Sequence, residues 1–140
     1  MRISMMTVCL LGLISVGCGS SNTPITVDQE KHEKLDQVGE LYRLYTFEKK
    51  RPPASISDFA PQQAVAPMAY EALTTGEIIV FMGANMTALE EGPPSGTSDE
   101  ILAYEKQVPE SGGEALMLDR SIKKMTPDQF KSAKKAGKSP

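Results

Sequence analysis

Apolar residues recur at steps of three and four between residues 28 and 50, a spacing that predicts one long amphipathic helix. Its apolar stripe is formed by Leu35, Val38, Leu41, Tyr42 and Tyr45. Thr26 and Gln29 have the spacing of a capping box, which places the start of the helix beside them. Pro52 and Pro53 end the helix, because proline supplies no amide donor and disfavours helical geometry in the residue before it.

The next segment, residues 54–73, mixes apolar residues with alanines and prolines. Prolines at this density interrupt regular structure. We expect a short helical turn over residues 57–60, followed by irregular chain packed on the core.

Four short runs of strand-forming residues follow. They are EIIVFM (77–82), EILAYEK (100–106), EALMLD (114–119) and SIKKM (121–125). Very few residues separate the last two runs, which predicts a tight hairpin around Arg120. Residues 84–99 are too polar and too rich in glycine and proline to bury themselves, so they predict a long exposed loop.

The chain closes with a clear helix start at TPDQF. Thr126 is the predicted N-cap, Pro127 takes the first helical position, and Gln129 completes a capping box. This helix is expected to run to about Ala136 and to stop at Gly137. The predicted fold is therefore α+β: a long N-terminal helix, an irregular segment, a small antiparallel sheet of about four strands and a short C-terminal helix.

The N-terminal 17 residues have the features of a signal peptide. Arg2 is their only charge, an apolar run follows, and small residues precede Cys18. The apolar run is too short for a spanning helix, which needs about 20 residues. Ser15 and Gly17 also fit an ordinary signal peptidase, so plain secretion with a free Cys18 remains an alternative.

The segment Ser15-Val16-Gly17-Cys18 resembles the lipobox of bacterial lipoproteins, with Ser15 in place of the usual leucine. The resemblance implies cleavage before Cys18, lipidation of its thiol, and a protein held in the cell envelope facing the periplasm or the exterior. Two or more acyl chains, such as palmitate, anchor stably where one holds only marginally. Gly19, rather than aspartate, favours the outer membrane. Residues 18–26 would then be the tether.

The length and the cysteine count fit one small domain. The chain has 140 residues, and loss of residues 1–17 leaves 123 with 14 basic and 18 acidic side chains. Cys9 leaves with the signal peptide and Cys18 is used by the lipid, so no disulfide is expected. We assign residues 27–137 to a single α+β domain and residues 138–140 to a tail.

A second resemblance to a known family rests on two segments of the chain. They are LYRLYTFEKKRPPASISDF and ILAYEKQVPESGGEALMLDRSIKKMTPDQF. The matching residues in the latter are Tyr104-Glu105-Lys106, Gly112-Gly113 and Leu118-Asp119. Over residues 35–60 and 76–132 the chain resembles the soluble part of bacterial type II secretion pseudopilin-like proteins, which implies a helix packed on a small sheet.

The chain departs from that family at two places. Arg120 stands where the family usually has glycine, and a two-residue turn would give it a positive φ at a cost of about 1 kcal/mol. Pseudopilins also keep an uncleaved apolar assembly helix, which a lipoprotein-like leader replaces here. The resemblance therefore supports the architecture rather than a role in secretion.

The sequence offers little for catalysis. His32 is the only histidine and is expected to be a solvated helix residue, with no second histidine or mature thiol to join it. We therefore expect no enzyme and no cofactor. Some pseudopilins bind calcium in a loop, and the candidate ligands here are Glu90, Glu91, Asp99 and Glu100. Their spacing favours a solvated acidic loop.

Charge is distributed unevenly along the mature chain. Residues 120–140 hold seven basic side chains and one acidic one, whereas residues 18–119 hold seven basic and seventeen acidic ones. Candidate contacts with an anionic surface are Lys131, Lys134, Lys135 and Lys138. The alternative is a helix end with lysines placed to suit its dipole. An acidic, exported chain is not expected to bind nucleic acid.

Two functions fit these observations. The first is a lipid-anchored envelope protein that acts as a structural or protein-interaction module without catalysis, with an unidentified envelope protein as its partner. The second is an envelope module that binds a small molecule, a peptide or calcium through the 84–99 loop and the neighbouring strand edge.

Overall fold

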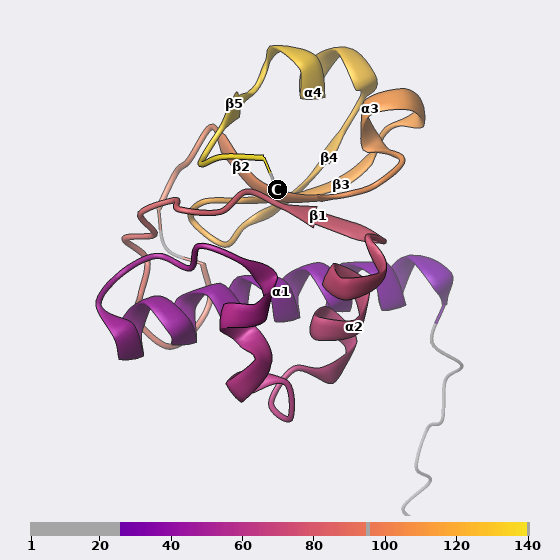
Figure 1. Cartoon of the computed structure of the whole chain (residues 1–140). Helices are drawn as coiled ribbons and strands as arrows, with labels where there is room; N and C mark the ends of the chain where they lie inside the picture. Colours follow the sequence, from indigo (N-terminus) through magenta and orange to yellow (C-terminus); the bar gives the residue numbers. More distant parts are fainter. Residues whose placement is uncertain (1–25, 95, 140) are drawn as a thin grey trace, which may run out of the picture.

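The computed structural model of the protein describes residues 26–94 and 96–139. The predicted signal peptide (1–17), Cys18 and the tether up to residue 25 lie outside these residues. Figure 1 shows one small sheet with the N-terminal helices packed below it and two short helices above it. This arrangement confirms the predicted α+β fold with a long N-terminal helix, a small antiparallel sheet and a short C-terminal helix.

The first helix, α1 (Val27–Lys49), forms as its sequence predicts. The Thr26 side chain accepts a hydrogen bond from the Gln29 backbone N–H, and the Gln29 side-chain oxygen accepts one from the Thr26 backbone N–H, so the capping box is present. The helix ends at Lys50, which adopts a left-handed conformation with φ of 57°. All five residues of the predicted apolar stripe are buried.

The short helical turn expected over residues 57–60 is confirmed, but the chain after it, expected to be irregular, is largely helical, and that part of the prediction was wrong. A 3-10 helix, η1 (Ile56–Gln62), is followed by an α-helix, α2 (Pro67–Thr75). Pro67 occupies the start of α2, where its missing N–H would have had no partner in any case. Ala69, Ala72 and Leu73 bury one face of α2. The proline therefore begins a helix here instead of preventing one.

Four antiparallel strands, in the order β1-β2-β3-β4, make up most of a five-stranded sheet. Their bounds are β1 (Ile78–Val80), β2 (Glu100–Glu105), β3 (Gly113–Met117) and β4 (Ile122–Met125). A short helix that the sequence did not predict, α3 (Val108–Ser111), joins β2 to β3. The predicted number and direction of these strands are confirmed.

The C-terminal helix starts where predicted and ends earlier. Its N-cap Thr126 accepts a hydrogen bond from the Gln129 backbone, and α4 spans Pro127–Ser132. The chain then becomes extended at Ala133, and β5 (Lys134–Lys135) pairs in parallel with the start of β2. The predicted continuation of the helix to Ala136 was wrong, because the Ala136 N–H donates to Ile101 of β2 (2.9 Å) instead of to a helical carbonyl.

Each face of the sheet covers its own apolar cluster. One cluster lies against α1, η1 and α2, and the other lies under α3 and α4 and contains Val108 and Phe130. The register of β2 against β3 shifts between Ile101 and Ala103. Leu102 and Ala103 consequently both belong to the first cluster, although strict alternation would have placed them on opposite faces.

The predicted exposed loop, residues 84–99, is only partly exposed. Glu90, Glu91 and Asp99 are exposed, as expected. Ala84 and Met86 are buried in the first cluster, however, and this part of the prediction was wrong. The sixteen residues are polar on average, and this average concealed the two apolar side chains near the start of the loop.

The β3–β4 turn is wider than two residues. The Arg120 N–H donates to the Met117 carbonyl oxygen (3.0 Å), and the Met117 N–H donates to the Ser121 carbonyl oxygen (2.8 Å). Three residues therefore form the loop, and the last of them, Arg120, has φ of 69°. Arg120 therefore has a positive φ, as expected for a tight hairpin. The turn has three residues and not two.

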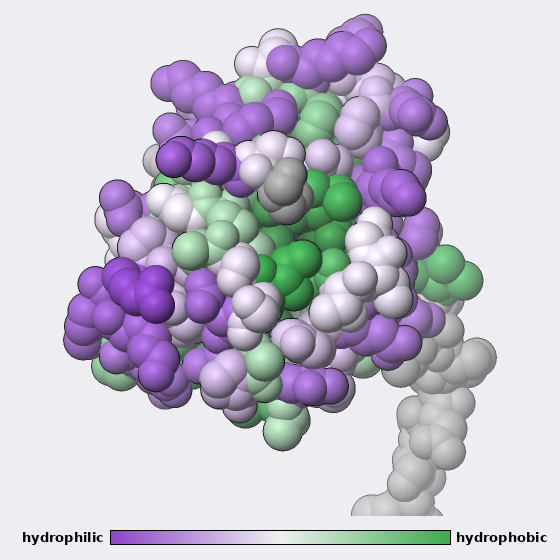
Figure 2. Space-filling model, viewed as in Figure 1, coloured by the Kyte–Doolittle hydropathy of each residue, from purple (hydrophilic) through white to green (hydrophobic). Residues whose placement is uncertain are grey.

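The surface carries few large apolar side chains. Figure 2 shows hydrophilic residues around the rim of the viewed face and a hydrophobic group near its middle, over β1. The most exposed large hydrophobic residues among those described are Val27, Phe47 and Val65. Val27 and Phe47 lie at opposite ends of α1, so they belong to separate parts of the surface. No helix in the described residues combines the length and the apolar character needed to cross a bilayer.

Candidate functional site

The four acidic residues considered as calcium ligands are spread along their loop. Glu90 and Glu91 lie before the Pro93-Pro94 pair, Asp99 ends the loop, and Glu100 begins β2. Within residues 26–94 and 96–139, no three His, Cys, Asp or Glu side chains are grouped so that they could hold a metal ion.

Arginine side chains hold the middle of this loop. Arg43 of α1 donates from Nη1 to the Leu89 carbonyl oxygen (3.0 Å). Arg120 donates from Nη2 to the carbonyl oxygens of Glu90 (2.9 Å) and Gly92 (3.1 Å). Backbone oxygens that a hard cation would need as ligands are therefore already bound to guanidinium groups.

Glu40 lies between these two arginines. It accepts hydrogen bonds from Arg43, and its carboxylate is 3.7 Å from Nη1 of Arg120. The hydrogen bonds from Arg43 lower the pKa of Glu40, and the same contact raises the pKa of Arg43. We assign this cluster a structural role, because its charged groups contact one another or loop carbonyl oxygens. The exception is the buried Nε atom of Arg120, which has no hydrogen-bond partner among the described residues.

The four lysines considered for an anionic surface do not form one row. Lys131 lies on α4, 3.9 Å from Asp128, and Lys134 is exposed on β5. The backbone of Lys138 pairs with Met82. Lys134 lines a hollow of about 410 Å³ together with Lys123, Lys124, Gln129 and Asp99. This open hollow is basic, because its lining includes three lysines and one aspartate.

Lys135 is turned inward. Its ammonium donates to the carbonyl oxygens of Phe130 and Ala133 and lies 4.0 Å from the centre of the Phe130 ring. Partial burial lowers the pKa of Lys135. Its ammonium therefore contacts the end of α4, although the side chain is only partly buried.

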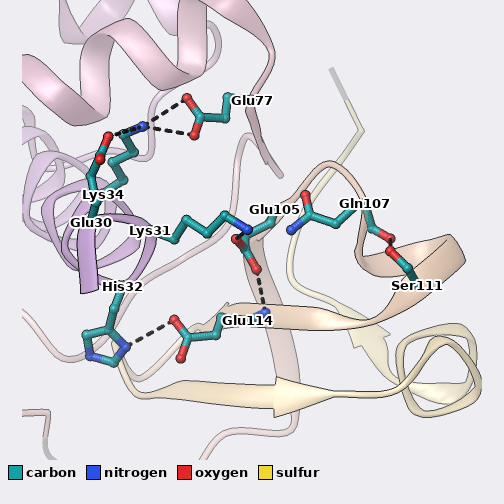
Figure 3. Close-up of polar contacts among 9 residues, drawn as sticks. All are labelled: Glu30, Lys31, His32, Lys34, Glu77, Glu105, Gln107, Ser111 and Glu114. Carbon is teal, nitrogen blue, oxygen red and sulfur yellow. Dashed lines mark hydrogen bonds and ion pairs between the residues drawn. The ribbon is translucent and has the colours of Figure 1, made fainter. Parts of the chain in front are cut away.

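A cluster of polar side chains that contact one another lies between the first half of α1 and the β2–β3 connection (Figure 3). We call it the α1–β3 cleft, defined by Lys31 and His32 of α1, Glu105 of β2, Gln107, and Glu114 of β3. Glu105 Oε2 accepts a hydrogen bond from the Glu114 N–H (2.7 Å), and Lys31 Nζ lies 3.4 Å from Glu105 Oε1. His32 Nδ1 lies 3.1 Å from Glu114 Oε2.

One turn along α1, a second ion-pair group has shorter contacts. Lys34 Nζ donates to both carboxylate oxygens of Glu77 (2.9 and 3.1 Å) and lies 2.9 Å from Glu30. Hydrogen bonding to Glu77, and then to Glu30, raises the pKa of Lys34. In Figure 3, Lys34 points toward Glu77, Lys31 toward Glu105 and His32 toward Glu114.

The Gly112-Gly113 pair gives the cleft its shape. Gly113 has φ of 152°, and a Cβ at this position would lie 2.5 Å from Glu105 Oε2 and 3.4 Å from Gln107 Nε2. At Gly112, with φ of 77°, a Cβ would lie 2.8 Å from the Met125 carbonyl oxygen. Glycine is needed at both positions, because a Cβ would lie too close to a neighbouring oxygen atom and because φ is positive.

Sequence reasoning missed this cleft. His32 is exposed, as expected, yet it also contacts a residue 82 positions away. The signal present in the sequence was Gly112-Gly113 directly before Glu114, since paired glycines mark places where another group comes close to the backbone.

Comparisons with known proteins give no relatives. No protein-family model matches the chain, and neither curated protein sequences nor solved structures include a match.

Proposed function

We propose that the protein is a lipid-anchored component of the bacterial cell envelope whose domain binds another polypeptide and carries out no catalysis. The lipid is attached to Cys18, and the partner is a second envelope protein. The α1–β3 cleft is the observation that carries this proposal, because it is a preformed polar hollow lined by charges of both signs at the surface.

The position of the cleft supports a role close to a membrane. Thr26, the cap of α1, is eight residues after Cys18, and eight extended residues span at most about 29 Å. Lys31 and His32 lie in the next two turns of α1. A partner that binds the cleft would therefore meet it within a few tens of ångströms of the lipid.

The anchor is tested by mass spectrometry of the processed chain and by detergent partitioning. We expect a chain that begins at an acylated Cys18 and enters the detergent phase, and a Cys18→Ser variant that stays in the aqueous phase. A free thiol at Cys18, or equal partitioning of the two proteins, would overturn the anchor.

The interaction role is tested separately by crosslinking in native membranes. We expect a discrete crosslinked species with the wild-type chain, which weakens when Glu114→Lys reverses a charge in the cleft. Glu110→Lys is the matched control, since Glu110 is exposed on α3 and does not line the cleft hollow. Equal loss in both variants would contradict the assignment of the cleft.

A further inference from the structure

Glu105 is a largely buried carboxylate whose two oxygens have contacts of unequal length. Its side chain is 7 % exposed, and an ionised group at such a position needs close compensation. Oε2 has a short hydrogen bond from the Glu114 N–H (2.7 Å). For Oε1, the nearest cation in the described chain is Lys31 Nζ at 3.4 Å, beyond the usual length of a charge-assisted hydrogen bond.

Lys31 is held loosely compared with its neighbour Lys34. Lys34 makes three contacts of 2.9 to 3.1 Å with two carboxylates, and its side chain is 16 % exposed. Lys31 makes one contact of 3.4 Å, and its side chain is 38 % exposed. A flexible lysine in this position can leave Glu105 at little cost when another cation arrives.

There is room for such a cation beside Glu105. A hollow of about 280 Å³ is lined by Glu105, Gln107, Ser111, Glu114 and Asp28, among others. The missing side chains of Gly112 and Gly113 leave this space open. Most of the lining side chains offer oxygen atoms, which accept hydrogen bonds and therefore suit a ligand that is rich in N–H donors.

The surface next to the hollow extends the negative charge. An adjoining hollow of about 600 Å³ shares Asp28 and Glu114 and adds Glu33 and Asp36. Across both hollows five carboxylates face Lys31, Lys124 and His32. A partner with a single positive charge would leave most of this surface uncompensated, whereas a chain with several basic side chains would match it.

We propose that the α1–β3 cleft binds a basic segment of the partner polypeptide, and that one lysine or arginine side chain of that segment enters the hollow and replaces Lys31 at Glu105. This inference rests on the proposed function and names the partner class. The incoming ammonium or guanidinium donates to Glu105 Oε1, while further basic residues of the segment lie over Glu33 and Asp36.

The test is a binding titration with the full chain in detergent micelles. The probe is a blocked peptide that alternates lysine with alanine, and the comparison peptide carries acetylated lysines. We expect saturable binding of the first peptide alone. Glu105→Gln should weaken it roughly tenfold or more, because the charge is lost while the acceptor for the Glu114 N–H is kept. Glu110→Gln, on the exposed surface, should leave the affinity unchanged.

A second pair of variants distinguishes replacement of Lys31 at Glu105 from an effect of net charge alone. Lys31→Ala removes the competing ammonium and should tighten binding about threefold. Lys34→Ala changes the net charge equally on the same helix, but its partners are Glu77 and Glu30, so it should have a smaller effect. Lys31 is exposed enough for its variant to fold even if Glu105→Gln does not.

Three results would overturn the proposal. They are equal effects of Lys31→Ala and Lys34→Ala, equal effects of Glu105→Gln and Glu110→Gln, and binding of 1,5-diaminopentane as tight as that of the peptide, which would assign the hollow to a free amine. None of them depends on acylation of Cys18, so failure here is distinguishable from failure of the anchor.

Discussion

Tyr42 and Ala84 exchange two hydrogen bonds in the core. The Ala84 N–H donates to the Tyr42 hydroxyl oxygen (2.8 Å), and the Tyr42 hydroxyl donates to the Ala84 carbonyl oxygen (3.1 Å). Tyr42 is fully buried in the middle of α1, and Ala84 begins the 84–99 loop. One side chain therefore satisfies both polar groups of a buried backbone residue and fixes the loop against the helix.

Tyr42→Phe should destabilise the fold by about 1–3 kcal/mol, because the Ala84 N–H would stay buried without a partner, while the Ala84 carbonyl oxygen would keep only its hydrogen bond from the Met86 N–H (3.1 Å). The measurement is urea unfolding of the two proteins. Tyr70→Phe is the matched control, since Tyr70 is only partly buried and its hydroxyl makes no hydrogen bond with the described residues. Equal losses in both variants would show that the Ala84 contacts carry no stability.

Stability should also depend on Tyr42 at high pH. Burial raises the pKa of Tyr42 from its ordinary 10.0 to about 12. The unfolded chain loses this proton first, so the free energy of unfolding should fall as the pH rises from 10 to about 12. Below pH 10 this contribution is complete. The difference between wild type and Tyr42→Phe isolates it from the titrating lysines, and a constant difference across that range would contradict the assignment.

The parts of the fold that depend on local sequence were predictable. The capping boxes of Thr26 with Gln29, and of Thr126 with Gln129, involve residues three apart and form as expected. The end of α4 was not predictable in this way. Its residues have helix-forming character, but pairing of β5 with β2 provides hydrogen bonds that no local pattern reveals.

The candidate site was less predictable for the same reason. Glu105 and Glu114 come close to Lys31 and His32 only because α1 packs beside the β2–β3 connection. The sequence separations exceed seventy residues, and no periodicity links them. The loop acids, by contrast, are close in sequence but are not gathered in the described structure.

The conformation of Arg120 provides a third prediction. Arg120→Ala and Arg120→Gly both lose the hydrogen bonds to Glu90 and Gly92, so both should be less stable than wild type. Alanine keeps the cost of the positive φ and glycine does not, so the glycine variant should be more stable than the alanine variant by about 1 kcal/mol.

Denaturant unfolding measures that order. Arg51 supplies the matched control, because it is exposed and is not among the residues with positive φ. There, glycine should be less stable than alanine, since glycine has the larger conformational entropy when unfolded. The same order at both positions would contradict a strained Arg120.

The 84–99 loop should not respond to calcium. The carbonyl oxygens of Leu89, Glu90 and Gly92 already accept hydrogen bonds from Arg43 and Arg120, and two guanidinium charges beside them oppose a divalent cation. The measurement is the melting temperature of the chain after chelator treatment and again in excess calcium. A site filled at a hundred times its dissociation constant would add about 2.7 kcal/mol, a clear rise in melting temperature. Such a rise would favour the calcium-binding module over the interaction module proposed above.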